Sequence, residues 1–238
     1  MKMKFTTFAI AAALATIGGY HALAQEPAKA KKVPAQTVTA AKPATDITPT
    51  WTIVEEDFWF PLRYEPMRSF DGARYDYRRS EEKSAAYEIN KAVSWLGWAE
   101  RHAMPETKAK LTEAATELKA VAKDLQSGNM FAAEKMDASL SKAASALSEW
   151  HYYRAKDWWG KSDAKHAGDD LVMAANYLQR AADSAHYQFG PDTQEVVTDV
   201  FRNGKWINDE KHTDHNWIAK NIEGVEGGLR EIAASLKK

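Results

Sequence analysis

Apolar residues follow a helical period through most of this chain after residue 80. Between Met136 and Trp150 they recur at steps of four, three, four and three residues, and the same alternation returns between Leu171 and Phe189. Such steps place apolar side chains on one face of an amphipathic helix. Prolines and glycine-containing turns divide the pattern into helices expected at 81–103, 105–125, a third ending at Gly160, 163–189, 191–201 and 213–236.

The apolar pattern of the first three expected helices returns in the last three at an offset of 82 residues. The segment that begins at Pro105 resembles the one at Pro191, here at an offset of 86, about one helical turn more. We therefore predict an all-α, up-and-down bundle of about six helices in a single domain, 81–238, built from two related three-helix units at 81–160 and 161–238. The matched positions are Ile89, Val93, Leu96 and Ala103 with Leu171, Ala175, Leu178 and Ala185, and Met136, Leu140, Ala143, Leu147 and Trp150 with Ile218, Ile222, Val225, Leu229 and Ile232.

Two segments ahead of the helices have compositions unlike that of a folded core. Residues 1–24 combine Lys2 and Lys4 with an apolar stretch and end in small residues at Ala22 and Ala24, the pattern of a signal peptide cleaved after Ala24. This pattern predicts a periplasmic or secreted protein. Residues 25–50 are rich in Ala, Lys, Pro and Thr and have almost no large apolar side chains, which predicts a flexible leader.

Residues 51–80 are dense in aromatic and arginine side chains. Pro61 and Pro66 argue against one continuous helix over the first half, although the pattern after Gly72 is compatible with helix. The favoured interpretation is an irregular arm whose rings fill grooves on the outside of the bundle and whose arginines pair with carboxylates. The alternative is an exposed surface for a glycan, an aromatic ligand or a partner protein.

Composition narrows the classes of function. The chain has no cysteine, which excludes disulfides and thiolate metal sites. Without Lys2 and Lys4 its 32 basic residues become 30 against 33 acidic ones, a net charge of about −3 that argues against a nucleic-acid partner. No stretch after the signal reaches the roughly 18 unbroken apolar residues of a transmembrane segment. Glycine-rich phosphate loops, nucleophile elbows and His-Glu-x-x-His helices are also absent from the sequence, so catalysis is not expected.

Two charges fall on stripes that are apolar in the other repeat. Glu100 takes the place of Ala182, and Arg154 takes the place of Leu236. Both lie near the C-terminal ends of helices expected to run in the same direction, so we expect their side chains to meet. One interpretation is a partly buried structural ion pair, and the alternative is a polar pocket in which the two side chains hold a small ligand.

Tryptophans supply a second candidate binding site. Trp95 and Trp98 share a helical line with His102, which sets a titratable group beside an aromatic wall. We expect a groove between the two three-helix units to accept an apolar or aromatic surface of a partner protein or a small ligand. The tryptophans expected to rim this groove are Trp95, Trp98, Trp150, Trp158 and Trp159.

Histidine and aspartate residues suggest a metal site as an alternative. Asp183 and His186 are three residues apart beside an apolar stripe, which puts both on one helical face. Ferritin-like bundles bind two metal ions through Glu-x-x-His pairs, but the acid here is the shorter Asp. His212, Asp214 and His215 form a separate cluster of residue types that bind zinc.

The sequence therefore favours an exported, non-catalytic helical bundle that acts by binding a protein partner or a small apolar or aromatic ligand. The alternative is a metal-binding or di-metal bundle, for storage or as an oxidoreductase, and a divalent metal is the one cofactor considered. A third alternative is a homo-oligomer whose apolar seams pair between copies of the chain.

Overall fold

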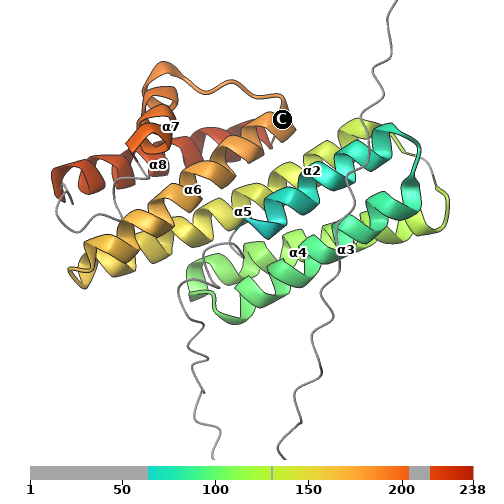
Figure 1. Cartoon of the computed structure of the whole chain (residues 1–238), viewed down its shortest axis with the longest axis horizontal. Helices are drawn as coiled ribbons and strands as arrows, with labels where there is room; N and C mark the ends of the chain where they lie inside the picture. Colours follow the sequence, from blue (N-terminus) through green and yellow to red (C-terminus); the bar gives the residue numbers. More distant parts are fainter. Residues whose placement is uncertain (1–63, 130, 204–214, 238) are drawn as a thin grey trace, which may run out of the picture. The chain divides into compact units, whose positions relative to one another are not determined.

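The computed structural model describes residues 64–129, 131–203 and 215–237, and all the regular structure in these ranges is helical (Figure 1). The all-α bundle predicted from the sequence is confirmed for this part of the chain. Residues 1–63, which include the expected signal peptide, the leader and the first part of the arm, lie outside it. The described helices are α2 (Glu65–Arg78), α3 (Glu82–Arg101), α4 (Pro105–Gln126), α5 (Ala133–Gly160), α6 (Ala164–Ala185), α7 (Pro191–Asn203) and α8 (His215–Ser235).

Helix boundaries are set by proline and by capping residues. Pro105 and Pro191 are the first residues of α4 and α7, where the missing N–H of proline costs no helical hydrogen bond. Helix α6 begins where the Asp163 carboxylate accepts the backbone N–H of His166 at 3.1 Å. It ends at His186, whose φ of 51° is in the left-handed region that stops a helix.

Residues 65–78 form a regular helix, α2, so the described part of the 51–80 segment differs from the irregular arm expected from the sequence. Pro66 lies in the first turn of this helix, where proline favours a helix start and does not interrupt the hydrogen bonds. Phe70 is 2% exposed, Ala73 is fully buried, and both belong to the main core. Arg74 Nε donates to Asp137 on α5 at 2.8 Å. Helix α2 is therefore an integral part of the bundle.

Helices α5 and α6 form a closely packed antiparallel pair. Ser141 Oγ donates to the carbonyl oxygen of Ala181, and Ser148 Oγ donates to that of Ala174, each at 2.7 Å. The donors are seven residues apart on α5 and the acceptors are seven residues apart on α6 in the opposite order, so the two helices run antiparallel. Helix α4 packs along another side of α5, α3 packs on α4 and α2, and α8 contacts α5, α6 and α7. None of the described helices combines the length and the apolar composition needed to cross a bilayer.

Buried apolar side chains form two clusters. One draws on α2 to α6, with Val197 of α7 and Ile232 of α8, and the other draws on α5 to α8. Leu229 of α8 packs against both clusters. Because α5 and α6 contribute side chains to both clusters, they link the core formed with α2, α3 and α4 to the core formed with α7 and α8.

Candidate binding groove

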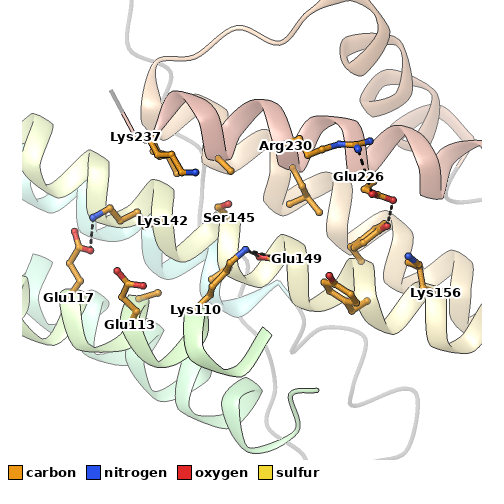
Figure 2. Close-up of a pocket in the computed structure, with 17 residues that line it drawn as sticks. Lys110, Glu113, Glu117, Lys142, Ser145, Glu149, Lys156, Glu226, Arg230 and Lys237 are labelled. Atoms are coloured by element: carbon orange, nitrogen blue, oxygen red, sulfur yellow. Dashed lines mark hydrogen bonds and ion pairs between the residues drawn. The ribbon is translucent and has the colours of Figure 1, made fainter. Parts of the chain in front are cut away.

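An open groove of about 470 Å³ lies between α4, α5 and α8 (Figure 2). Each of the three helices contributes one stripe of side chains to its lining. The α5 stripe extends from Lys142 to Lys156, which corresponds to a length of about 20 Å at the helical rise per residue. The aliphatic part of the lining consists of Ala114, Ala146, Leu229, Ala233 and Leu236.

Four charged side chains of the groove form ion pairs between α4 and α5. Lys110 Nζ lies 2.6 Å from a carboxylate oxygen of Glu149, and Lys142 Nζ lies 2.9 Å from one of Glu117. The Ser139 hydroxyl also donates to Glu117 at 2.8 Å. These contacts hold the two helices in antiparallel register. They also neutralise most of the charge where α4 faces α5.

Two tyrosines of α5 line one end of the groove. The Tyr152 hydroxyl donates to the Glu226 carboxylate on α8 at 2.5 Å. Burial, and then this hydrogen bond, raise the pKa of Tyr152, while the same hydrogen bond lowers the pKa of Glu226. The Lys156 ammonium lies 5.3 Å from the Tyr152 ring centre and 6.0 Å from that of Tyr153, within the range of a cation–π contact. This end of the groove is therefore aromatic with a positive charge above it.

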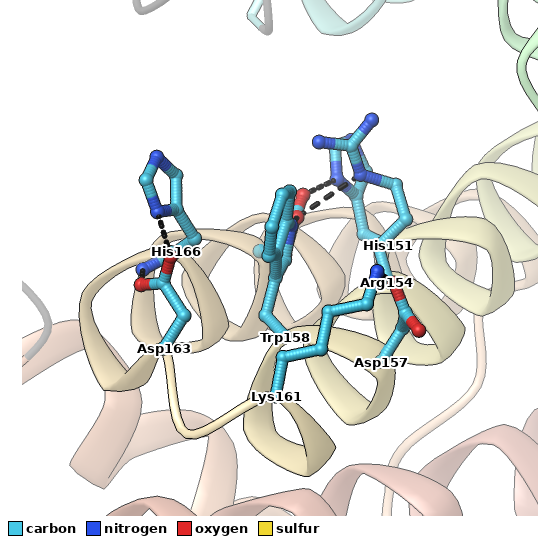
Figure 3. A network of polar contacts seen from close by, with 8 residues as sticks. His151, Arg154, Asp157, Trp158, Lys161, Asp163 and His166 are labelled. Atoms are coloured by element: carbon cyan, nitrogen blue, oxygen red, sulfur yellow. Dashed lines mark hydrogen bonds and ion pairs between the residues drawn. The ribbon is translucent and has the colours of Figure 1, made fainter.

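A second polar cluster is buried between α5 and α6. Its centre is Asp170 of α6, which accepts hydrogen bonds from three α5 side chains. Figure 3 labels these three, His151, Arg154 and Trp158. The donors are His151 Nδ1 at 2.7 Å, Arg154 Nε at 3.0 Å and Trp158 Nε1 at 3.1 Å.

Asp170 is held ionised although it is 2% exposed. Burial by itself raises the pKa of this carboxyl, but the positive charge of Arg154 and the hydrogen bond from His151 outweigh burial and lower the pKa to about 2. Because three donors already occupy the carboxylate, the cluster is suited to fixing α5 against α6. We assign it a structural role.

The tryptophans expected to rim a groove are placed elsewhere. Trp98 contacts Trp95, His102 and Trp150, with ring centres 6.3, 4.4 and 5.8 Å away. Near the end of α5, Trp158 lies beside His166 and Trp159 lies beside His215. Tyrosines, aliphatic residues and charged side chains line the α4–α5–α8 groove, and none of the five tryptophans is among its lining residues.

Glu100 and Arg154, expected to meet, are not within ion-pair distance of each other. The Arg154 guanidinium pairs with Asp170 and stacks over the Trp150 ring at 4.9 Å. The predicted partner is therefore wrong. The repeat comparison locates an arginine with a special environment, but sequence offsets do not give the rotation of α6 that brings Asp170 to it.

Asp183 and His186, two of the candidate metal ligands, contact different partners. His186 Nε2 lies 3.4 Å from Asp137 on α5, whereas Asp183 accepts from Gln179 on its own helix at 2.8 Å. His212 and Asp214 lie outside the described residues, and His215 begins α8. Within the ranges that the structure describes, no group of three or more His, Asp or Glu side chains converges as metal ligands do.

Sequence reasoning missed the residues that line this groove because the three helices that form it are far apart in the chain. Lys142, Glu149 and Lys156 repeat at steps of seven on the side of α5 away from its apolar stripe, a pattern typical of an ordinary solvated face. The available signal was the pair Tyr152 and Tyr153, which continues this face with aromatic side chains.

No protein-family model, no curated protein and no solved structure matches this chain. The fold and the groove define its class, an all-α bundle with an open groove between helices.

Proposed function

We propose that this protein is a non-catalytic binding protein and that its α4–α5–α8 groove accepts an amphipathic helix of a partner protein. The observation that carries the proposal is the groove itself, in which three parallel or antiparallel helices each present one side-chain stripe around an aliphatic strip. Helix-binding grooves use this arrangement, because residues at steps of three and four on the incoming helix can follow the strip.

The dimensions favour a helix over a compact ligand. The groove is open to solvent along about 20 Å, a length that matches three to four helical turns. Small-molecule sites bury most of their ligand in a closed, mainly apolar cavity. This groove has charges of both signs beside the aliphatic strip, as the polar rim of a protein–protein interface does.

Two expectations from the sequence belong to the same proposal. The pattern of residues 1–24 supports export, so the partner is sought in the periplasm or outside the cell. The 82-residue repeat supports duplication of a three-helix unit. In that case α4 and α5 come from the first unit, α8 comes from the second, and the groove lies between them.

Site-directed photo-crosslinking in the native host tests the proposal. A photoreactive residue replaces Ala233, which is exposed in the groove, and in a second strain it replaces the neighbouring Ala234, which is exposed outside the groove. We expect an adduct from position 233 alone, mapped by mass spectrometry to an amphipathic helical segment of another protein.

A synthetic peptide of the mapped segment then makes the test quantitative. It should bind the purified chain, and Ala233→Trp, which fills the groove, should weaken binding at least tenfold while Ala234→Trp leaves it unchanged. Adducts that form equally from both positions, or that map to a second copy of this chain or to a non-helical segment, contradict the proposal.

A further inference from the structure

Three charges in the groove form no ion pair with another described residue, although the Lys156 charge contributes at longer range to lowering the pKa of Glu226. They are Glu113 on α4, Lys156 on α5 and Lys237 just beyond the end of α8. The other lining charges are neutralised within the protein, as the ion pairs of Lys110 and Lys142 show. Arg230 is also partly neutralised, because it lies 3.8 Å from Glu226. The three charges without an ion pair are therefore the ones that a bound molecule can best complement.

Their positions form a fixed pattern along the groove (Figure 2). Lys237 lies at the same end as Lys142, and Lys156 lies at the other end. The interval between Lys142 and Lys156 is about four helical turns. Glu113 lies on the α4 wall between Glu117 and Lys110, about one turn from the Lys237 end.

We infer that the occupant is a helix with an acidic residue at each end of its contact stripe, about 14 residues apart, and a basic residue on the edge that faces α4. The acidic residues pair with Lys156 and Lys237, and the basic residue pairs with Glu113. This inference rests on the proposed function and adds the charge pattern of the partner.

The chain's own leader does not fit this pattern. Residues 25–50 contain the four lysines Lys29, Lys31, Lys32 and Lys42 against two acidic residues, so their net charge has the wrong sign to pair with Lys156 and Lys237. Four prolines in the same segment oppose helix formation. The charge pattern therefore points to a different protein as the occupant.

Three synthetic peptides test the inference by fluorescence anisotropy with the full mature chain. All are 18-residue amphipathic helices with the same Ala and Leu stripe. The first has Glu at the two end positions and Lys on the α4-facing edge, the second has these charges reversed, and the third has Gln at all three positions. Exposed ion pairs are individually weak, so we expect the first to bind about three- to tenfold more tightly than the third and the second to bind least.

Charge reversal in the protein provides the matched comparison. The double variant Lys156→Glu with Lys237→Glu should reverse the order of the first two peptides, while Lys119→Glu with Lys123→Glu makes the same charge change on exposed α4 positions outside the groove and should keep the order. Raising the salt concentration should reduce the differences among the peptides.

The outcomes separate the two proposals. Suppose that the Gln peptide binds, that Ala233→Trp weakens its binding, and that the charged peptides bind with the same affinity as the Gln peptide. The charge pattern is then wrong, and the groove remains a helix-binding site. If the Lys119 and Lys123 double variant reverses the order as well, the preference reflects net charge and the charge pattern is again wrong. If none of the three peptides binds at millimolar concentration, both proposals are wrong.

Discussion

Asp170 receives hydrogen bonds from three α5 side chains at a position that water barely reaches. Asp170→Asn keeps the size of the side chain but removes the negative charge that Arg154 faces. Because the substitution weakens three hydrogen bonds to a buried carboxylate and removes its attraction to Arg154, we expect a loss of about 3 kcal/mol in the free energy of unfolding at neutral pH, measured by urea denaturation. Asp157→Asn, which breaks an exposed ion pair with Lys161 at 2.6 Å, is the control and should cost less than about 1 kcal/mol.

The same carboxyl makes stability depend on pH. Its pKa of about 2 in the folded protein is below its ordinary value of 3.8, so the unfolded chain binds this proton more readily. The stabilising contribution is fully present above about pH 4 and is lost as the pH falls towards 2, by an amount of about 2 kcal/mol. We expect Asp170→Asn to lack this part of the acid dependence. Equal slopes of unfolding free energy against pH for the two proteins would contradict this assignment.

Single residues show how far the sequence could predict contacts. The repeat identifies Arg154 as a charge on an apolar stripe, and the arginine indeed has a buried partner in Asp170. Its partner could not be predicted, because which side chains meet depends on the rotation of two helices about their axes. The sequence pattern specifies the apolar face of each helix but not this angle.

At the scale of elements, α8 approaches its neighbours through glycines. A Cβ atom on Gly228 would lie 2.5 Å from Leu178 Cδ2 and 2.8 Å from Thr193 Cγ2, whereas nothing lies within 4 Å of one on Gly227. We expect Gly228→Ala to lower the free energy of unfolding by about 1–3 kcal/mol through overpacking. Gly227→Ala should raise it by about 0.5–1 kcal/mol, because alanine is the better helix former. Thermal unfolding of the pair measures both effects, and equal shifts would contradict close packing at Gly228.

Helix α7 is capped by a side chain from α8. The Glu231 carboxylate accepts from the backbone N–H of Gly190 at 3.0 Å and from the hydroxyls of Thr193 and Tyr187. Because an anion stabilises the start of a helix, Glu231→Ala should cost about 1–2 kcal/mol and should speed hydrogen exchange mainly in α7. Glu223→Ala, at an exposed position of α8, is the control. Unchanged exchange in α7 would show that the cap is not needed.

Element boundaries are the most predictable part of the fold. Pro105 and Pro191 begin helices as expected, because proline at a first turn both stops the preceding segment and favours the next one. Pro66 has the same first-turn role in α2, although in the sequence it argues against a continuous helix. The helix after Pro66 was harder to predict, because aromatic and charged side chains are mixed with the apolar ones and obscure the helical period. The inward-facing positions are clear only from the structure, in which Phe70 and Ala73 are buried.

At the scale of the whole molecule, α5 and α6 contribute to both buried clusters. A substitution that destabilises α2 should therefore also destabilise α8. Phe70→Ala removes a ring that is 2% exposed and should lower the free energy of unfolding by about 3–5 kcal/mol. We expect a single urea transition and equal losses of hydrogen-exchange protection in α2 and α8, because one cooperative unit unfolds together. Tyr75→Ala, on the same helix but 61% exposed, should change stability by less than about 1 kcal/mol. Two separate transitions, with α8 still protected, would instead show that the clusters fold independently and that the groove between them can change its width.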